Sequence, residues 1–336
     1  MISKIDKEKI KTWFVTGASS GVGQELCRQL LARGYNVIAV ARRVPDFKHK
    51  NALCLSCDVT NPDEVQNAIT KGLEVFGKID VLSNNAGISA NITCEEENID
   101  HLKQVMEVNY FGAFNTINAI LPHFRENNNG TIISNTSKSG LAPRAYGTAY
   151  CSSKFAIEGL TGVVWHETKS FCRVMAFELG WFEGTEIGIK KKIISPEFEC
   201  YKNLPIFYKP LIYDFRNDLS IAVKTIIDTV EKEKLPRHLI LGKDALETVK
   251  YEIKALNLCY NYCKKIGLYC SIPLKKDSFL STIFSIKNEY KNGTKRKIIT
   301  ILGIKLKIKA KIRMVVRERE RERVILLPVK KVQLVA

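Results

Sequence analysis

Tyr150 and Lys154 are the residues in this sequence whose types and spacing best suit proton transfer. Residues at positions i and i+4 share one face of a helix, so the two side chains are expected to be neighbours. A free phenol has a pKa of about 10 and exchanges protons poorly at neutral pH. We expect the Lys154 ammonium to favour the phenolate and so to lower the pKa of Tyr150. The pair predicts acid–base chemistry at an oxygen atom.

Two further polar residues are candidates for the same site. Ser137 lies 13 positions before Tyr150, at the end of a segment with strand character, and its hydroxyl can bond an oxygen on which charge develops. Ser134 and Ser139 flank it, and the spacing from Tyr150 is the reason for choosing Ser137. Asn109 falls within a long helical segment, where the alternative to a role in the site is that it caps or kinks the helix.

A glycine-rich turn near the start of the chain joins a short apolar strand to an amphipathic helix. Gly17, Gly21 and Gly23 stand where the chain turns sharply, where backbone approaches a ligand and where helix and strand pack closely. The start of the helix offers free N–H groups to a pyrophosphate. An ordinary glycine turn is the alternative, but the position after the first strand favours dinucleotide binding. The loop is completed by Ser19, Ser20 and Val22.

The end of the second apolar strand distinguishes between the two nicotinamide dinucleotides. NAD-binding folds place a carboxylate there for the ribose 2′-OH, whereas NADP-binding folds supply arginine for the 2′-phosphate. Here the strand Val37–Ala41 ends without an acid and continues into Arg42 and Arg43. NADP(H) is therefore the preferred cofactor and NAD(H) the second choice. Two solvated loop arginines are the competing interpretation.

Five motifs stand in the order and spacing of the short-chain dehydrogenase/reductase family, which the chain resembles over about residues 10–265. The motifs are Thr16-Gly-x-x-x-Gly-x-Gly23, Asn84-Asn-Ala-Gly87, Asn109, Ser137 and Tyr150-x-x-x-Lys154. The resemblance implies hydride transfer between a nicotinamide cofactor and a carbonyl or alcohol carbon. It also implies that Ser137, Tyr150, Lys154 and Asn109 are catalytic. Lys154 would hold the nicotinamide ribose, and Asn109 would support a water that relays protons.

Further cofactor contacts follow from the same resemblance. Asp58 and Val59, after the third strand, match the family's adenine contact, although an Asp that starts a loop is also an ordinary turn former. Asn85, Ala86 and Gly87 follow the fourth strand. They would line a groove at the carboxyl ends of the strands, where ligands bind in such sheets.

The family pattern is broken after the sixth strand, in Glu178-Leu-Gly-Trp-Phe-Glu-Gly-Thr185. Gly180 and Thr185 match residues that grip the nicotinamide amide. Leu179 stands in place of the family's proline, and the loop is one residue longer. Leucine lacks the fixed φ of proline, so the nicotinamide side of the pocket is expected to be less rigid. The alternative function is a catalytically weak regulatory or scaffolding protein that binds cofactor on the same fold.

Short apolar runs alternate with longer segments of helical period, which predicts repeated βα units. Strands are expected at Thr12–Thr16, Asn36–Ala41, Ala52–Cys57, Ile79–Ser83, Gly130–Thr136, Cys172–Phe177 and His238–Leu241. Helices are expected at Val22–Arg33, Pro62–Phe76, Ile99–Phe124, Thr148–Lys169, Asp218–Glu233 and Lys243–Lys265. The predicted fold class is α/β, a Rossmann-type doubly wound parallel sheet of about seven strands. It forms a single domain over residues 1–275, followed by an appended basic C-terminal tail over residues 276–336.

The net charge of +17 is concentrated in this tail. Residues 275–336 hold 18 lysines and arginines against 5 acidic residues, so the rest of the chain carries only +4 and no nucleic-acid partner is expected. Ile304–Arg313 alternates apolar and basic residues, as on one face of a strand, and Arg317–Arg323 alternates Arg and Glu. A disordered extension is the first interpretation, and peripheral contact with an anionic membrane is the second.

Cellular context is inferred from the termini and the cysteines. No apolar run reaches the 18 or so residues of a membrane-spanning helix, and Met1–Lys11 lacks a secretory signal, so a cytoplasmic location is expected. The ten cysteines are scattered, as suits a reducing compartment. Cys54-x-x-Cys57 and Cys259-x-x-x-Cys263 have no second ligand pair at zinc-site spacing, so no metal is expected.

Partners are predicted only in outline. Glu186–Arg216 is rich in aromatic residues and suits a bulky, partly apolar carbonyl or alcohol substrate, although aromatic residues also serve plain packing. The family resemblance implies a homodimer or homotetramer that pairs through the helices at Ile99–Phe124 and Thr148–Lys169.

Overall fold

A computed structural model describes residues 11–89, 91–182, 197–202, 204 and 217–267, and the backbone of six strands between residues 284 and 334. The chain divides into two compact units, Met1–Leu258 and Cys259–Ala336. The first unit contains every described residue of the predicted site. The predicted boundary at residue 275 lies outside the described residues and stays a prediction.

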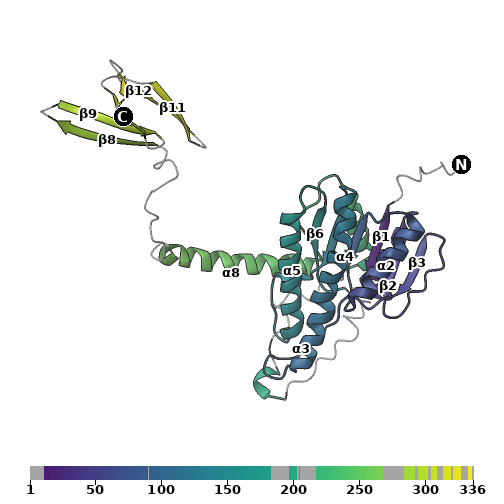
Figure 1. The fold of residues 1–336 in the computed structure, drawn as a ribbon. Coiled ribbons are helices and arrows are strands. Elements are labelled where there is room, and N and C mark those ends of the chain that lie inside the picture. The colour runs from purple at the N-terminus through teal and green to yellow at the C-terminus, as the bar shows by residue number, and fades with distance from the viewer. Residues whose placement is uncertain are drawn as a thin grey trace. The chain divides into compact units, whose positions relative to one another are not determined.

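The first unit is built on a seven-stranded sheet with the order β3-β2-β1-β4-β5-β6-β7 (Figure 1). All neighbouring strands are parallel. The strands are β1 (Thr12–Thr16), β2 (Asn36–Ala41), β3 (Ala52–Ser56), β4 (Val81–Asn84), β5 (Thr131–Asn135), β6 (Arg173–Leu179) and β7 (His238–Leu241). The strand order reverses between β1 and β4, which opens a crevice at their carboxyl ends.

Helices cover both faces of the sheet, which explains why the central strands are apolar without alternation. The helices of this unit are α1 (Gly21–Ala32), α2 (Pro62–Phe76), α3 (Ile99–Met106), α4 (Gly112–Glu126), α5 (Thr148–Glu167) and α7 (Leu219–Val230), and α8 (Lys243–Gly267) begins in it. One core cluster joins α1 and α7 through Leu26, Leu30, Val223 and Ile226. The other joins α2, α4 and α5 through side chains that include Ile69, Ile120 and Val164.

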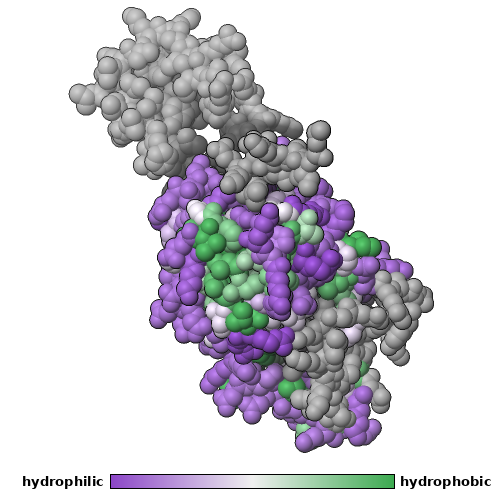
Figure 2. All heavy atoms as spheres, turned by 90° about the vertical axis from the view of Figure 1, so that its right-hand side faces the viewer, coloured by the Kyte–Doolittle hydropathy of each residue, from purple (hydrophilic) through white to green (hydrophobic). Residues whose placement is uncertain are grey.

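The edge of the sheet at β3 is less covered than its centre. Four of the five β3 residues, Ala52 to Leu55, are half-buried and the fifth, Ser56, is exposed, whereas β1 is buried throughout. Figure 2 turns this side of the molecule toward the viewer and shows hydrophobic residues gathered among hydrophilic ones.

The predicted strands and helices are confirmed, with one correction. The single helix predicted at Ile99–Phe124 is two α-helices, α3 and α4, joined by a π-helical turn at Glu107–Phe111. Asn109 lies in the middle of this turn. Its side chain bonds the backbone of Ile88, in the segment after β4. A contact with a residue so far away in the sequence leaves no signature in helical periodicity.

The second unit contains two antiparallel sheets. Strands β8 (Phe284–Lys291), β9 (Thr294–Ile301), β10 (Ile304–Ile308) and β13 (Val332–Leu334) form one, in the order β13-β10-β9-β8. Strands β11 (Arg313–Glu318) and β12 (Arg321–Leu326) form the other. The predicted alternating strand is thus present as β10, and the Arg–Glu run spans β11 and β12. Within the described part of the chain, no helix is long and apolar enough to cross a membrane.

Candidate active site

A pocket of about 350 Å³ opens at the carboxyl ends of the central strands. It lies where the strand order reverses, between the β1–α1 turn and the segments that follow β2, β3 and β4. Its walls are formed by Gly17, Ser19, Ser20, Gly21, Val22, Ala41, Arg42, Arg43, Cys57, Asp58, Val59, Asn85, Ala86, Gly87, Ile88, Val108 and Asn135. Of the residues predicted to bind cofactor, twelve line this pocket.

The glycine turn has the shape that was expected of it. Gly17 and Gly21 have φ of +66° and +53°, a region that favours glycine. A Cβ atom on Gly17 would lie 2.9 Å from the Ala86 Cα atom. Gly23 does not line the pocket: a Cβ atom there would lie 2.4 Å from the Gly17 carbonyl oxygen, so this glycine allows α1 to pack against the turn.

The start of α1 faces the pocket with unused donors. Ser20 is the N-cap residue, and its side chain makes no capping hydrogen bond. The first N–H groups of a helix have no partner within it, and together with the helix dipole they favour a bound anion. The backbone of this turn therefore fits a pyrophosphate.

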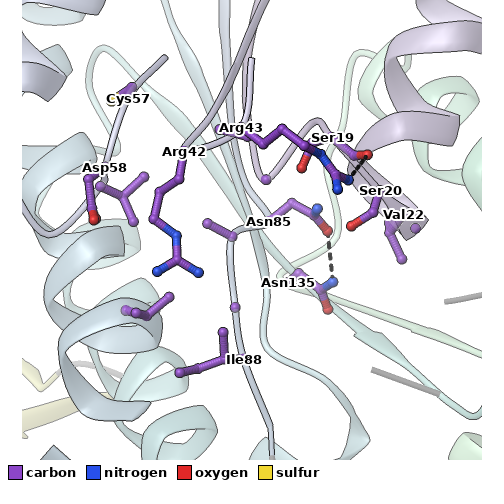
Figure 3. Close-up of a pocket in the computed structure, with 17 residues that line it drawn as sticks. Ser19, Ser20, Val22, Arg42, Arg43, Cys57, Asp58, Asn85, Ile88 and Asn135 are labelled. Atoms are coloured by element: carbon purple, nitrogen blue, oxygen red, sulfur yellow. Dashed lines mark hydrogen bonds between the residues drawn. The ribbon is translucent and has the colours of Figure 1, made fainter. Parts of the chain in front are cut away.

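Arg42 and Arg43 point in different directions from the end of β2 (Figure 3). The Arg42 side chain extends into the pocket beside Asp58, whereas Arg43 turns toward the glycine turn and donates a hydrogen bond to the Ser19 carbonyl oxygen at 3.4 Å. Both arginines were predicted to bind the cofactor. Their different directions leave Arg42 as the guanidinium with the better access to a ligand.

Hydrogen bonds fix the floor of the pocket. The Thr16 hydroxyl accepts from the backbone N–H groups of Asn85 and Ala86 at 2.9 and 3.0 Å. The Asn135 side-chain amide donates to the side-chain oxygen of Asn85 at 3.0 Å (Figure 3). These bonds tie the ends of β1, β4 and β5 together, so the segment after β4 is held close to the glycine turn.

Asp58 serves both interpretations that the sequence left open. Its carboxylate accepts from the backbone N–H and the hydroxyl of Thr60 at 3.0 and 2.8 Å, which is the geometry of a turn former. The same residue lines the pocket with Val59. Cys57 also lines it, and burial raises the pKa of this thiol to about 11, so it is neutral at pH 7.

Ser137 and Tyr150 meet across the loop that joins β5 to α5. Burial raises the pKa of Tyr150 and the nearby Ser137 side chain opposes that shift, so the two side chains lie close to each other. Ser137 has φ of +63°, unusual for a residue with a side chain, and its hydroxyl accepts from the Ser139 N–H at 3.3 Å. Backbone in a sparsely populated region is often found at functional sites.

Lys154 lies next to Tyr150 and is almost fully buried. Its ammonium donates to the Asn135 carbonyl oxygen at 2.7 Å and lies 5.6 Å from the centre of the Tyr150 ring. Burial lowers the pKa of Lys154 to about 8, although the charge of Glu158 opposes this shift. A Cβ atom on Gly87 would lie 3.6 Å from the Lys154 ammonium nitrogen, so the lysine reaches the wall of the pocket.

The predicted lowering of the Tyr150 pKa is wrong in its net direction. Burial of the ring raises the pKa of Tyr150, while the hydrogen bond with Ser137 and the positive charge of Arg144 act in the opposite sense. The phenol is therefore protonated at neutral pH and ready to donate. The sequence showed the neighbouring lysine, but the depth at which the ring is buried depends on the packing of the fold.

Asn109 is buried, and its side chain is engaged in the structure. Its amide nitrogen donates to the Ile88 carbonyl oxygen at 3.0 Å and to the Ser153 hydroxyl at 2.9 Å. Its side-chain oxygen accepts from the Ile88 N–H at 2.8 Å. Both N–H donors are thus occupied, so Asn109 holds the segment after Gly87 and places α5 against the π turn. A role toward a relay water stays a prediction.

The segment after β6 is only partly described. Leu179 is buried in the core cluster of that face, which accounts for an apolar residue at the proline position. Gly180 does not line the pocket, and a Cβ atom there would lie 2.1 Å from a carboxylate oxygen of Asp244. Thr185 and most of Glu186–Arg216 lie outside the described residues.

Several pocket residues were not predicted. They are Ala41, Cys57, Ile88, Val108 and Asn135. Asn135 carries the clearest signal, because it stands at the end of β5 two positions before Ser137. Ile88 and Val108 are brought to the pocket by the contact between Asn109 and the segment after β4, which spans 21 positions.

Known proteins are similar to this chain in sequence. A family model for short chain dehydrogenases matches residues 11–193. Oxidoreductase BOA17 of Botryotinia fuckeliana is 28% identical over 248 residues, which cover 70% of this chain and 90% of that protein. Dehydrogenase/reductase SDR family member 7 of Mus musculus is 34% identical over 184 residues, 51% of each protein. The chain thus spans about half the length of the mouse relative.

Solved structures give the same result. A short-chain dehydrogenase from Streptomyces avermitilis has a TM-score of 0.70 and 27% identity, over 79% of this chain and 99% of that one. Two enzymes with lower identity share the fold. One, from Burkholderia cenocepacia, was solved with NADP (24%, TM-score 0.59, over 75% and 96% of the two chains). The other, from Burkholderia phymatum, was solved with NAD (19%, TM-score 0.62, over 76% and 96%).

The chain belongs to the short-chain dehydrogenase/reductase family, an oxidoreductase family with members that bind NADP or NAD. The model match covers more than half of the chain, and its Rossmann-type sheet has the family fold.

Proposed function

We propose that this protein is an NADP(H)-dependent oxidoreductase that reduces a ketone or aldehyde, or oxidises the corresponding alcohol. The observation that carries the proposal is the contact between three buried side chains, Ser137, Tyr150 and Lys154, beside a pocket that fits a dinucleotide. Bound nicotinamide would supply or accept the hydride. Gly17, Gly21 and the first N–H groups of α1 would hold its pyrophosphate, and Arg42 a 2′-phosphate.

Ser137, Tyr150 and Lys154 each have a separate role in the proton transfer. In reduction, the Ser137 hydroxyl bonds the substrate oxygen and Tyr150 donates its proton to that oxygen. The Lys154 ammonium, 5.6 Å from the ring centre, stabilises the negative charge left on the phenolate. Oxidation runs these steps in reverse, with Tyr150 accepting the alcohol proton.

Turnover by the Tyr150→Phe variant tests the assigned role. We expect loss of ketone and aldehyde reduction by at least about 100-fold, because general acid catalysis contributes roughly that much, with NADPH binding retained. Turnover equal to that of the unchanged protein contradicts the role of Tyr150.

The alternative is a cofactor-binding regulatory or scaffolding protein, which the replacement of proline by Leu179 also favours. NADPH binding without turnover across a broad panel of carbonyl compounds would support this alternative.

A homo-oligomer is part of the proposal. Apolar side chains are exposed on the π turn, α4 and α5, namely Phe111, Phe114, Phe155 and Val163. Exposed aromatic and aliphatic groups on neighbouring helices suit a subunit interface. Sedimentation velocity should give a dimer or tetramer, and Phe155→Glu should shift it toward monomer; a monomer at all concentrations contradicts this assignment.

A further inference from the structure

Lys138, the residue directly after Ser137, forms a buried ion pair whose role the proposed chemistry leaves unexplained. Its ammonium lies 2.6 Å from the Asp244 carboxylate, and each side chain is only 8% exposed. Burial lowers the pKa of Lys138, while the negative charge of Asp244 acts to raise it. Two buried charges cost desolvation energy that an apolar pair would not, so such a pair is expected to serve more than stability.

The Asp244 carboxylate also holds the segment that follows β6. It accepts from the Trp181 N–H at 2.8 Å and from the side-chain amide of Asn217 at 2.7 Å. The Asn217 amide in turn donates to the Trp181 carbonyl oxygen at 2.7 Å. Both backbone polar groups of Trp181 are therefore anchored to one cluster, which lies at the start of α8.

Two glycines allow the carboxylate to come this close. A Cβ atom on Gly180 would lie 2.1 Å from one Asp244 oxygen, and one on Gly242 would lie 2.9 Å from the same oxygen. Gly242 has φ of +106°, which also favours glycine. The Gly180 N–H donates to the Leu241 carbonyl oxygen at 2.9 Å. The ends of β6 and β7 are thus built around Asp244.

We propose that Lys138 and Asp244 are a positioning pair that holds Ser137 at a set distance from the loop at Gly180–Trp181. This inference rests on the proposed function. Lys138 shares its backbone with Ser137, which binds the substrate oxygen, and Asp244 bonds the loop at the carboxyl end of β6, beside the end of β5. The pair provides a constraint that Leu179, unlike a proline, does not supply.

Lys138→Met and Asp244→Asn test the pair, and Lys224→Met is the matched control. Lys224 forms an ion pair with Asp228 at the same distance, 2.6 Å, but with side chains 65% and 38% exposed. Asparagine keeps the shape of Asp244 but carries no charge, so Lys138→Met and Asp244→Asn break the ion pair from its two sides.

We expect both test variants to lower kcat by about 100-fold, the cost of a displacement of about 1 Å in an active site. Their affinity for NADPH should fall by about tenfold, while affinity for 2′,5′-ADP, which lacks the nicotinamide half, stays unchanged. Hydrogen exchange at the Trp181 amide should become faster without any ligand. Lys224→Met should match the unchanged protein in all three measurements.

The outcomes separate the two proposals. Unchanged kcat, NADPH affinity and Trp181 exchange in both variants overturn the positioning pair, as does an equal loss of NADPH and 2′,5′-ADP affinity. If the unchanged protein neither binds NADPH nor turns over, the proposed function fails. In that case Trp181 exchange still decides whether Lys138 and Asp244 hold the loop.

Discussion

Arg42 and Arg43 are neighbours in the sequence, but their side chains lie in different surroundings. Arg43 bonds the Ser19 carbonyl oxygen, and Arg42 extends into the pocket (Figure 3). A guanidinium that meets a phosphate forms charge-assisted hydrogen bonds, which are among the stronger ones in proteins. The preference for NADP(H) over NAD(H) is therefore expected to depend on Arg42 alone.

Arg42→Ala should weaken NADPH binding by about 10-fold to 100-fold and leave NADH binding nearly unchanged. Fluorescence titration with both cofactors measures the effect. Arg43→Ala is the control, and it should weaken both cofactors alike because it loosens the glycine turn. Equal losses for the two cofactors in Arg42→Ala contradict its assignment to the 2′-phosphate.

The pH dependence of reduction should report on Lys154. Burial lowers its pKa to about 8, against the charge of Glu158, so the ammonium is present below pH 8 and lost above it. Burial holds the proton on Tyr150 over the same range, with Ser137 and Arg144 acting against it. Because only the charged lysine stabilises the phenolate, kcat/KM for reduction should fall about tenfold per pH unit above pH 8.

Steady-state kinetics between pH 6 and 10 would show this fall. Lys154→Met should be slow at every pH and lack the decline. A profile for the unchanged protein that stays flat to pH 10 contradicts the role given to the ammonium.

At the scale of elements, Asn109 in the π turn at Glu107–Phe111 connects this turn to the segment after β4 and to α5. Asn109 makes three side-chain hydrogen bonds there, two to Ile88 and one to Ser153. Asn109→Ala would leave the Ile88 N–H and carbonyl groups without these partners. Each buried polar group left unpaired costs about 1 to 3 kcal/mol.

We therefore expect Asn109→Ala to lower the free energy of unfolding by about 2 to 4 kcal/mol and to reduce turnover. Urea denaturation followed by circular dichroism measures the first effect. Asn115→Ala, on the next helix, is the comparison, because Asn115 is half-buried and donates to the Val59 carbonyl oxygen at 3.0 Å. A loss no larger than that of Asn115→Ala would mean that the π turn does not depend on Asn109.

Helices and strands that are determined by residues within or next to them could be predicted from the sequence. Helix α2 begins where Asn61 caps the N–H groups of Asp63 and Glu64, and it ends at Gly77, with φ of +74°. The central strands were equally predictable because they are apolar and buried on both faces. The interruption of α3–α4 was given only as the alternative interpretation of Asn109, that it kinks the helix, because its cause is the contact with Ile88, 21 positions away.

The same division holds for the site. Glycine turns and the Tyr-Lys spacing are local patterns, so twelve of the predicted cofactor residues do line the pocket. The bond between Lys138 and Asp244 spans 106 positions, and neither residue belongs to a motif. The direction of the Tyr150 pKa was wrong because burial, which depends on the whole fold, outweighs the pattern of neighbouring residues.

For the whole molecule, stability should depend on an acidic pair between the middle of α5 and β6. Glu158 and Glu178 lie together with His238, whose ring nitrogen is 2.7 Å from Glu178 and 3.6 Å from Glu158. Burial raises the pKa of Glu158 to about 7, and the charge of Glu178 adds to the shift while His238 opposes it. The hydrogen bond with Glu178 raises the pKa of His238.

A folded-state pKa above the usual value means that the folded protein keeps a proton that the unfolded chain releases. The free energy of unfolding should therefore fall as pH rises from about 4.5 to 7. Glu158→Gln should remove most of this fall and raise stability at pH 8 by about 1 to 3 kcal/mol. Thermal unfolding across this range checks it, with Glu167→Gln, an exposed change on the same helix, as control. An unaltered pH dependence in Glu158→Gln contradicts the assignment.

The cluster at Asp244 has a consequence for how the binding specificity of this protein can be changed. Loops after the strands of such folds are natural places to exchange segments between relatives. Here the segment that starts at Trp181 is bonded to Asp244 and Asn217, and Asp244 in turn to Lys138. A transplant of this loop into a relative therefore needs these three partners in the recipient, whereas variation of side chains alone keeps the bonds at Trp181, because they are made to its backbone.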